Sequence, residues 1–213
     1  MEELDLLKKD WKRSEGNFRQ ISELDIYKMI HKSSSSVVKW ILVISMIEFV
    51  VLTVLGLVVS DENYVQRLEM MHILTVMNVL TYLNYAVVIG FIYFFYKNFR
   101  AISVTDSAKN LMKSILKSRK TVQYYIYYNL TMFVFIFALV LVCSCMYDPK
   151  MIETFNQISQ HDNSTLIWIV TAVLFIVMFA AMFGLFWLFY RLVYGFLLRK
   201  LYKNYQELKK IEL

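Results

Sequence analysis

Helix-breaking and turn-forming residues are scarce in this chain, which has one proline and five glycines among its 213 residues. A soluble domain of this length would use more of both, since glycine and proline average about 7% and 5% of residues. Its apolar fraction would also lie nearer half than the 58% found here. The composition is therefore unlike that of an ordinary soluble globular domain.

Residues with metal-binding or nucleophilic chemistry are also few. The three histidines, His31, His72 and His161, stand far apart, and no two have the i, i+4 spacing of a helical metal site. Cys143 and Cys145 would point apart on a helix, so a disulfide between them would be strained. The sequence has no glycine-rich phosphate loop and no nucleophile elbow. We therefore expect no enzymatic activity, no metal and no cofactor.

Long apolar runs are the main feature that is present. They cover residues 37–59, 72–96, 122–146 and 166–190, and each has about 23 to 25 residues. About 20 apolar residues in a helix are enough to cross the hydrocarbon core of a bilayer. The sequence therefore predicts an all-α fold, a polytopic four-helix transmembrane bundle.

Positive charge is distributed unequally between the two predicted sides of the membrane. Segments 1–36, 97–121 and 191–213 carry seven, seven and six Lys or Arg residues, whereas the segments on the other side contain only Arg67 and Lys150. Lys and Arg are enriched in cytoplasmic loops of membrane proteins. We therefore predict a multi-pass protein of the inner (plasma) membrane with both termini in the cytoplasm.

The first 36 residues predict a cytosolic helical hairpin. Leu4, Leu7 and Trp11 fall on one face of a short amphipathic helix. Ser22 and Asp25 resemble a capping box that begins a second helix, which should run without a break into the first span. The apolar face of the first helix either docks a partner protein or packs on the protein's own cytosolic helices, and the sequence leaves both interpretations open.

The segment 97–121 predicts a basic amphipathic helix that leads into the third span. Lys109, Lys113, Lys117 and Lys120 surround its apolar face and are the expected contacts for anionic lipid headgroups. Nucleic acid is the competing ligand for a basic segment. The sequence contains no nucleic-acid recognition motif that would support it, so no nucleic-acid partner is expected.

One acidic residue, Glu48, lies near the middle of a predicted span. A carboxylate at that depth costs about 2.5 to 3.5 kcal/mol on insertion scales, so it needs a hydrogen-bond partner. Counting residues from the inner ends of the spans places Asn84 and Thr131 in nearly the same slice. Asn78 and Thr81 complete the predicted intramembrane polar cluster.

Two interpretations of this cluster compete. A structural one is a polar clamp that joins the first three spans, with Asn84 as the expected partner of Glu48. A functional one is a proton or cation relay, for which intramembrane acids are typical components. A relay normally needs several acids or a chain of histidines, so the clamp is favoured.

Small residues predict a close contact between the second and fourth spans. Ala86 and Gly90 form one small-xxx-small pair, and Ala180 and Gly184 form another. Such pairs let two helix backbones approach closely in a membrane. Both pairs lie at similar distances from the inner ends of their spans, so we expect them to meet.

Four stretches, Glu2–Lys12, Ile26–Ile30, Ser33–Ser36 and Val38–Trp40, resemble a group of uncharacterised flavobacterial membrane proteins. The similarity is close over residues 1–50 and continues in hydropathy beyond them. Proteins of that group often carry the label beta-carotene monooxygenase. Carotenoid-cleaving oxygenases bind iron through four histidines, and this chain has three, on different sides of the membrane. We therefore reject that label.

The resemblance also implies a regulatory setting, because members of the group are frequent neighbours of alternative sigma factor genes. We therefore hypothesise a non-enzymatic regulator or scaffold of the inner membrane. It would dock a cytosolic or membrane protein through its N-terminal helices, in an anti-sigma-like manner. The alternative is a small transporter or channel subunit with a polar path around Glu48.

Overall fold

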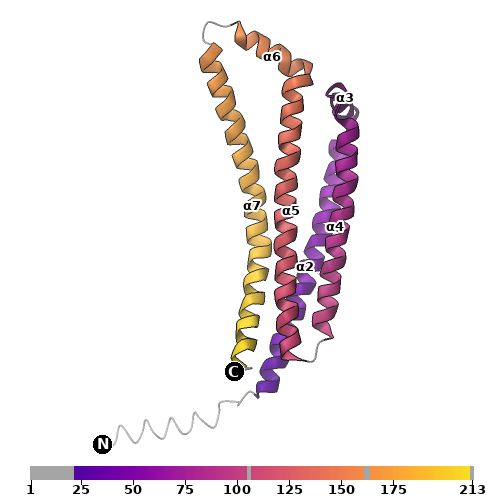
Figure 1. Cartoon of the computed structure of the whole chain (residues 1–213), viewed down its shortest axis with the longest axis vertical. Coiled ribbons are helices and arrows are strands. Elements are labelled where there is room, and N and C mark those ends of the chain that lie inside the picture. Colours follow the sequence, from indigo (N-terminus) through magenta and orange to yellow (C-terminus); the bar gives the residue numbers. More distant parts are fainter. Residues whose placement is uncertain (1–21, 105–106, 161–163, 212–213) are drawn as a thin grey trace, which may run out of the picture.

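The computed structural model describes residues 22–104, 107–160 and 164–211, and each secondary-structure element in these ranges is an α-helix (Figure 1). The helices are α2 (Glu23–Val59), α3 (Glu62–Met70), α4 (Leu74–Ser103), α5 (Ala108–Tyr147), α6 (Pro149–Ser159) and α7 (Ser164–Ile211). The predicted all-α fold is confirmed. The predicted first helix, with Leu4, Leu7 and Trp11, lies outside the described residues.

Four of these helices are long and apolar enough to cross a membrane, which fits a multi-pass membrane protein. They are α2, α4, α5 and α7; α2, α5 and α7 each contain one apolar run of the sequence, and α4 contains the second run except its first two residues. The second run was expected to begin at His72, but α4 begins at Leu74. His72 instead adopts a left-handed backbone conformation, with φ of 56°, and turns the chain between α3 and α4.

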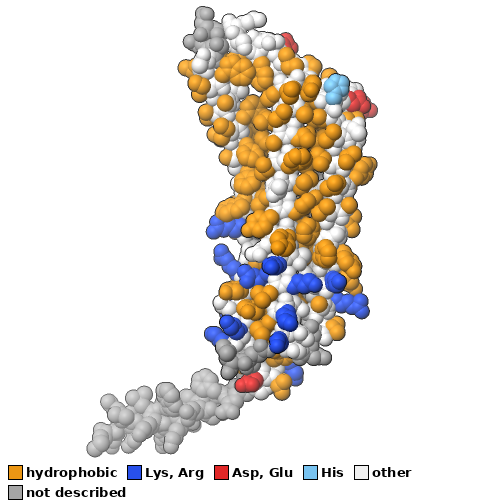
Figure 2. Space-filling model, viewed as in Figure 1, with side chains coloured by type: hydrophobic (Ala, Val, Ile, Leu, Met, Phe, Trp, Pro, Cys, Tyr) orange, Lys and Arg blue, Asp and Glu red, His pale blue; other side chains and the backbone are white. Residues whose placement is uncertain are grey.

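The long helices exceed the thickness of a bilayer. They have 37, 30, 40 and 48 residues, or about 45 to 72 Å at about 1.5 Å per residue, whereas the hydrocarbon core is about 30 Å thick. Most of the excess lies at one end of the bundle, here called the basic end, which carries the start of α2, the connection between α4 and α5, and the end of α7 (Figure 1). Lys and Arg side chains gather over this end of the visible face, and apolar side chains cover the rest (Figure 2).

The start of α2 follows the predicted capping pattern. The Ser22 side chain accepts a hydrogen bond from the backbone N–H of Asp25 at 3.2 Å and donates one to the Asp25 carboxylate at 2.8 Å. From this cap, α2 continues to Val59 without interruption. The prediction of one helix that enters the first span directly is confirmed.

Each long helix packs mainly against its antiparallel neighbours. Helix α2 contacts α4 and α7, and α5 contacts the same two helices from the other side. Helices α4 and α7, which run in the same direction, therefore occupy one diagonal of the bundle. An up-and-down order of helices gives this arrangement, because consecutive antiparallel helices become neighbours.

The predicted small-residue contact between the second and fourth spans is wrong. A Cβ atom built on Gly90 or on Gly184 would meet nothing within 4 Å, so no second helix backbone lies against either glycine. Their companions Ala86 and Ala180 are exposed on the surface of the bundle. The diagonal placement of α4 and α7 explains the difference, since it keeps these two small surfaces apart.

The packed core lies in the basic half of the bundle. Buried positions recur there at intervals of three and four residues, the spacing of a coiled-coil seam. On α5 they are Leu111, Ile115, Ser118, Val122 and Tyr125, and on α7 they are Tyr190, Tyr194, Leu197, Leu201, Asn204 and Leu208. On α2 the buried face runs from Ile30 to Glu48, and beyond Glu48 this helix is largely exposed to its surroundings.

Polar contacts connect the helices within this half. The Asn204 amide donates to the hydroxyls of Ser33 and Ser34 at 3.1 and 2.9 Å, which links α7 to α2. The Asn98 amide donates to the Thr121 hydroxyl at 3.1 Å, which links α4 to α5. Buried polar pairs of this kind set the register between packed helices, because any other register leaves them without partners.

The opposite end of the bundle is closed by the short helices α3 and α6. The Arg67 guanidinium forms an ion pair with the Asp148 carboxylate at 2.8 Å, which ties the end of α3 to the start of α6. Asp148 is also the N-cap of α6 and accepts from the backbone N–H of Lys150 at 3.0 Å. Nearby, Cys143 and Cys145 are free thiols, as their spacing predicted.

Truncation of a core leucine tests where the packed core lies, because the loss of stability should be larger at a buried leucine than at an exposed one. Leu201 on α7 is fully buried, so Leu201→Ala should lower the free energy of unfolding by about 2 to 5 kcal/mol. Leu188→Ala makes the same chemical change on the same helix at a side chain that is 46% exposed, and its effect should be much smaller. Thermal unfolding in mild detergent measures both. Equal losses would contradict the location of the core.

The Arg67–Asp148 pair should make stability depend on acid pH. The hydrogen bond from Arg67 holds the pKa of the Asp148 carboxyl below its ordinary value. The folded state therefore gains stability above the unfolded pKa of about 4 and loses it as the pH falls through the lower folded pKa. Wild type should exceed Asp148→Asn by about 1 kcal/mol at pH 7, with the difference shrinking below about pH 4. Unfolding of both proteins between pH 3 and pH 7 measures it, and a constant difference would contradict this account.

Candidate functional site

Glu48 of α2 points its side chain toward α7 and is 8% exposed. The Tyr190 hydroxyl donates to one of its carboxyl oxygens at 2.5 Å, and the Tyr194 hydroxyl donates to the other at 2.8 Å. The two tyrosines are four residues apart on α7, a spacing that places both side chains on one helix face. Helix α7 thus presents two donors to the two acceptors of a single carboxyl group.

Aromatic rings surround these hydrogen bonds from the other two long helices. Tyr125 of α5 is 1% exposed, and its ring centroid lies 6.4 Å from that of Tyr190 and 5.9 Å from that of Tyr194. Phe91 and Phe95 of α4 pack edge-on against Tyr125, with centroids 5.4 and 5.5 Å away. All four long helices therefore contribute to one cluster, here called the Glu48 cluster. Its rings exclude water from the side of α4 and α5.

The hydroxyl groups of Tyr190 and Tyr194 offset the free-energy cost of burying the Glu48 carboxyl group. Among the described residues, the ion pairs are Arg67–Asp148 and Lys203–Glu207, and neither involves Glu48. A buried carboxyl group without partners would be costly, so the two hydrogen bonds hold α7 at one height and rotation against α2. The cluster has the chemistry of an interhelical clamp.

The predicted partner of Glu48 was wrong. Asn84 accepts a hydrogen bond from the Tyr128 hydroxyl at 3.0 Å and so links α4 to α5, not α4 to α2. Counting residues along each span estimates the height of a side chain but not the direction in which it points around the helix axis. Glu48 faces α7, and Asn84 faces α5.

The other residues of the predicted polar cluster lie away from Glu48. Asn78, Thr81 and Thr131 are all exposed on the surface of the bundle. The Thr81 hydroxyl donates to the carbonyl of Met77 in its own helix at 2.8 Å. The structure therefore separates these polar side chains instead of lining one path with them.

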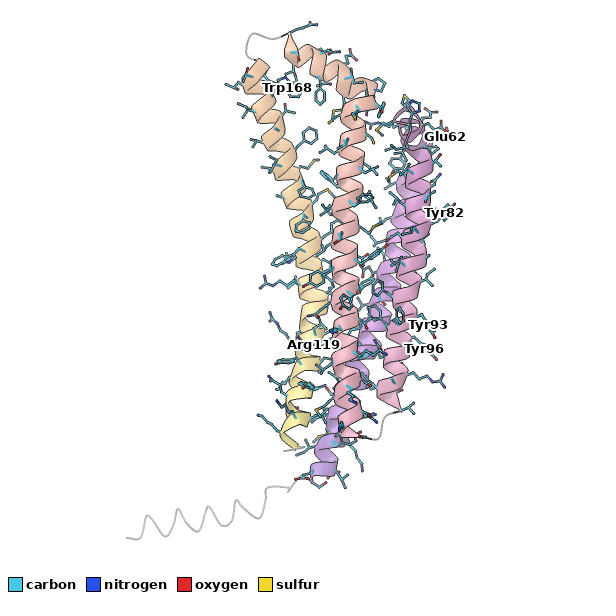
Figure 3. All side chains as sticks on the ribbon, viewed as in Figure 1. Glu62, Tyr82, Tyr93, Tyr96, Arg119 and Trp168 are labelled. Atoms are coloured by element: carbon cyan, nitrogen blue, oxygen red, sulfur yellow. The ribbon has the colours of Figure 1, made fainter. Side chains whose placement is uncertain are left out.

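Tyr190 and Tyr194 are the residues that the sequence reasoning missed. Tyr190 was counted as the last residue of the fourth span, and Tyr194 as part of the tail that follows it. The signal was present in the sequence, because both tyrosines continue the three-and-four spacing of Leu197 and Leu201. Tyrosines on the lipid-facing side behave differently: Tyr82, Tyr93 and Tyr96 of α4 project away from the bundle (Figure 3).

The four lysines that were predicted to contact lipid lie on the outside of the bundle. Lys109, Lys113, Lys117 and Lys120 are all exposed along the basic half of α5. Arg119 lies between α5 and α7, with its guanidinium carbon 4.5 Å from the centroid of the Tyr202 ring (Figure 3). Within the ranges that the structure describes, no group of three or more His, Cys, Asp or Glu side chains could hold a metal ion.

Comparison with known proteins identifies the family. A family model described as a domain of unknown function (DUF8845) matches residues 24–213, and the chain therefore belongs to that family. The match begins at the start of α2 and covers the whole helical bundle. No curated protein and no solved structure matches the chain.

Removal of the tyrosine hydroxyls tests the clamp. Tyr190→Phe and Tyr194→Phe should each lower the free energy of unfolding by about 1 to 2 kcal/mol, because each leaves one buried carboxyl oxygen without a donor. Thermal unfolding in mild detergent measures the losses. Tyr124→Phe removes a hydroxyl from a side chain that is 59% exposed and should change little.

Glu48→Gln adds a comparison that keeps the shape of the side chain. The amide oxygen still accepts from one tyrosine, and the amide nitrogen can donate to the other, so the loss should be below about 1.5 kcal/mol. A loss in Tyr124→Phe as large as in Tyr190→Phe would show that the hydrogen bonds to Glu48 do not hold α2 against α7.

Proposed function

We propose that this DUF8845-family chain is a non-enzymatic regulator or scaffold of the inner membrane. It would hold a cytosolic partner through the segment that precedes α2. The observation that carries this proposal is the continuation of α2, α5 and α7 past the predicted spans into one packed bundle at the basic end. The excess of Lys and Arg at that end supports a cytoplasmic location for it and for both termini.

The extensions are long enough to form a platform above the membrane surface. Residues 23–36 of α2 and 108–121 of α5 each add 14 residues before the spans, or about 21 Å at about 1.5 Å per residue. Residues 201–211 of α7, which follow Lys200 at the level of Ser36, add about 16 Å. Asn204 links α7 to α2 within this region, and the ring nitrogen Nε2 of His31 donates to the Ile102 carbonyl at 2.7 Å. Cross-links of this kind hold the first turns of α2 in place against α4 and α7.

Leu4, Leu7 and Trp11 supply the apolar side chains for docking. Leu and Trp on one face of a short helix are the anchors by which an amphipathic helix occupies a groove on another protein. The resemblance of residues 1–50 to flavobacterial membrane proteins encoded beside alternative sigma factors suggests a regulatory partner and an anti-sigma-like tether. The matched family region begins at residue 24, so this docking segment precedes the bundle that defines the family.

Anionic lipid would orient the platform. Lys109, Lys113, Lys117 and Lys120 are exposed on α5, between about 20 Å and about 3 Å from the start of the predicted span at residue 122, at about 1.5 Å per residue. Each basic residue near an anionic surface contributes about 1 kcal/mol to its attraction. Lys117 and Lys120, the two nearest the span, would contact the headgroups, and Lys109 and Lys113 would add longer-range attraction to the anionic surface.

The transporter or channel alternative has less support. It needs polar side chains in a continuous path, and Glu48 lies among tyrosines while Asn78 and Thr131 face outward. Apolar side chains of all four long helices, among them Ile41, Ile102, Ile115 and Leu201, also pack together in the core at the basic end. A regulator needs no polar path through the membrane, and the packed basic end would serve as its platform for a partner.

The double change Leu7→Asp with Trp11→Ala tests the docking proposal. It removes two of three apolar anchors and should reduce capture of the partner more than tenfold, because anchors of this type cost at least about 2 kcal/mol each when lost. Affinity capture from native membranes followed by quantitative mass spectrometry compares the variant with wild type.

Lys8→Gln with Lys9→Gln alters two neighbouring polar residues of the same segment and serves as the control. A partner retained by this control and lost from the apolar variant supports docking. Partners that survive the apolar change would overturn the proposal. Circular dichroism of the purified variant should match wild type, because the changed residues precede the packed bundle.

A further inference from the structure

An apolar groove of about 660 Å³ lies on the seam between α2 and α7. Val51 and Leu52 line it from α2, and Leu185 and Phe189 line it from α7. Glu48 lies at one side, but both of its carboxyl oxygens are already bound to the tyrosine hydroxyls. The groove therefore offers an almost wholly apolar surface, and its volume is within the range of about 300 to 1,000 Å³ typical of ligand sites.

A second hollow of about 450 Å³ continues the groove toward the basic end. The two share Ile44 and Val193 in their walls, so they follow one another along the same seam. The second hollow has a different character, because Ser36, Trp40 and Lys200 line it together with apolar residues. One continuous seam thus changes from apolar to cationic toward the basic end.

The length of the seam matches the thickness of one leaflet. Its walls on α2 run from Ser36 to Leu52, which is about 24 Å at about 1.5 Å per residue. One leaflet measures about 20 to 22 Å, half of the 40 to 45 Å of a bilayer with its headgroups. Trp40 is 58% exposed and lies near the cationic end, where a tryptophan would sit at the membrane interface.

We propose that this seam binds one anionic phospholipid of the leaflet on the basic side. An acyl chain occupies the apolar groove beside Val51 and Leu185, and the phosphate-bearing headgroup lies at Lys200. The match of length, of polarity along the seam and of charge at its end identifies this occupant. A soluble partner protein would not reach the apolar groove, since that groove opens into the predicted hydrocarbon region.

The Glu48 cluster explains why the seam stays open at this depth. The hydrogen bonds from Tyr190 and Tyr194 to the Glu48 carboxyl group hold α7 against α2 at this level. Beyond that point Leu52 and Leu185, which line the groove, are 48% and 67% exposed. A lipid chain placed there covers apolar surface that the protein itself does not cover.

Native mass spectrometry of the full chain with a lipid mixture tests the headgroup. The purified protein is equilibrated with equal amounts of phosphatidylglycerol and phosphatidylcholine that carry identical acyl chains. Wild type should retain one lipid per chain with an approximately fivefold preference for phosphatidylglycerol, the factor expected for one lysine near the phosphate. Lys200→Gln should remove this preference.

Lys203→Gln is the matched control, because Lys203 lies on the same helix, pairs with Glu207 and does not line the seam. It should retain the preference of wild type. Equal retention of both lipids by wild type would overturn the proposal, and so would equal effects of the two lysine changes. These measurements do not depend on the docking segment at residues 1–21.

A second pair of variants tests the chain-binding groove. Val51→Trp should fill the groove and reduce lipid retention more than tenfold, whereas Val50→Trp places the same ring on the neighbouring exposed position outside it. A phosphatidylglycerol with a photoreactive diazirine in its tail should label residues 44–52 and 185–193 in wild type and in Val50→Trp. Labelling spread evenly over all four long helices, or equal retention by the two variants, would show ordinary boundary lipid only and overturn the proposal.

Discussion

The burial of one carboxyl group in an apolar bundle is the constraint on which the arrangement of the long helices depends. Glu48 needs hydrogen bonds at both oxygens, and Tyr190 and Tyr194 provide them from one face of α7. The contact fixes the height of α7 against α2 and the rotation of both helices. Tyr125 and the phenylalanines of α4 then pack around it, so the same contact locates the other two helices.

The Glu48 cluster divides the bundle into two halves that differ in where their apolar side chains lie. In the basic half, apolar side chains recur at coiled-coil spacing and the helices bury them against one another, as in a water-soluble bundle. In the other half most apolar side chains face outward, as expected where lipid and not water is the surrounding medium. The proposed partner platform belongs to the first half, and the proposed lipid seam begins in that half at Ser36 and continues past Glu48 to Leu52.

Local features of this fold were predictable, because they depend on residues close together in the sequence. The cap formed by Ser22 and Asp25, the unbroken α2 and the separation of Cys143 from Cys145 followed from spacing alone. The predicted contacts between residues far apart in the sequence were wrong in two cases. Asn84 was paired with Glu48, and Gly90 with Gly184, on matching heights, but each pair faces in different directions.

By itself the sequence determined how many helices are long and apolar enough to span a membrane and which end of the bundle is basic. Those properties depend on composition and on periodicity along one helix. Only the tertiary structure decided which helices are neighbours, that two tyrosines and not an asparagine satisfy Glu48, and that a groove remains between α2 and α7. These depend on the rotation of each helix about its axis, which is set when all four helices pack together and their polar groups find partners.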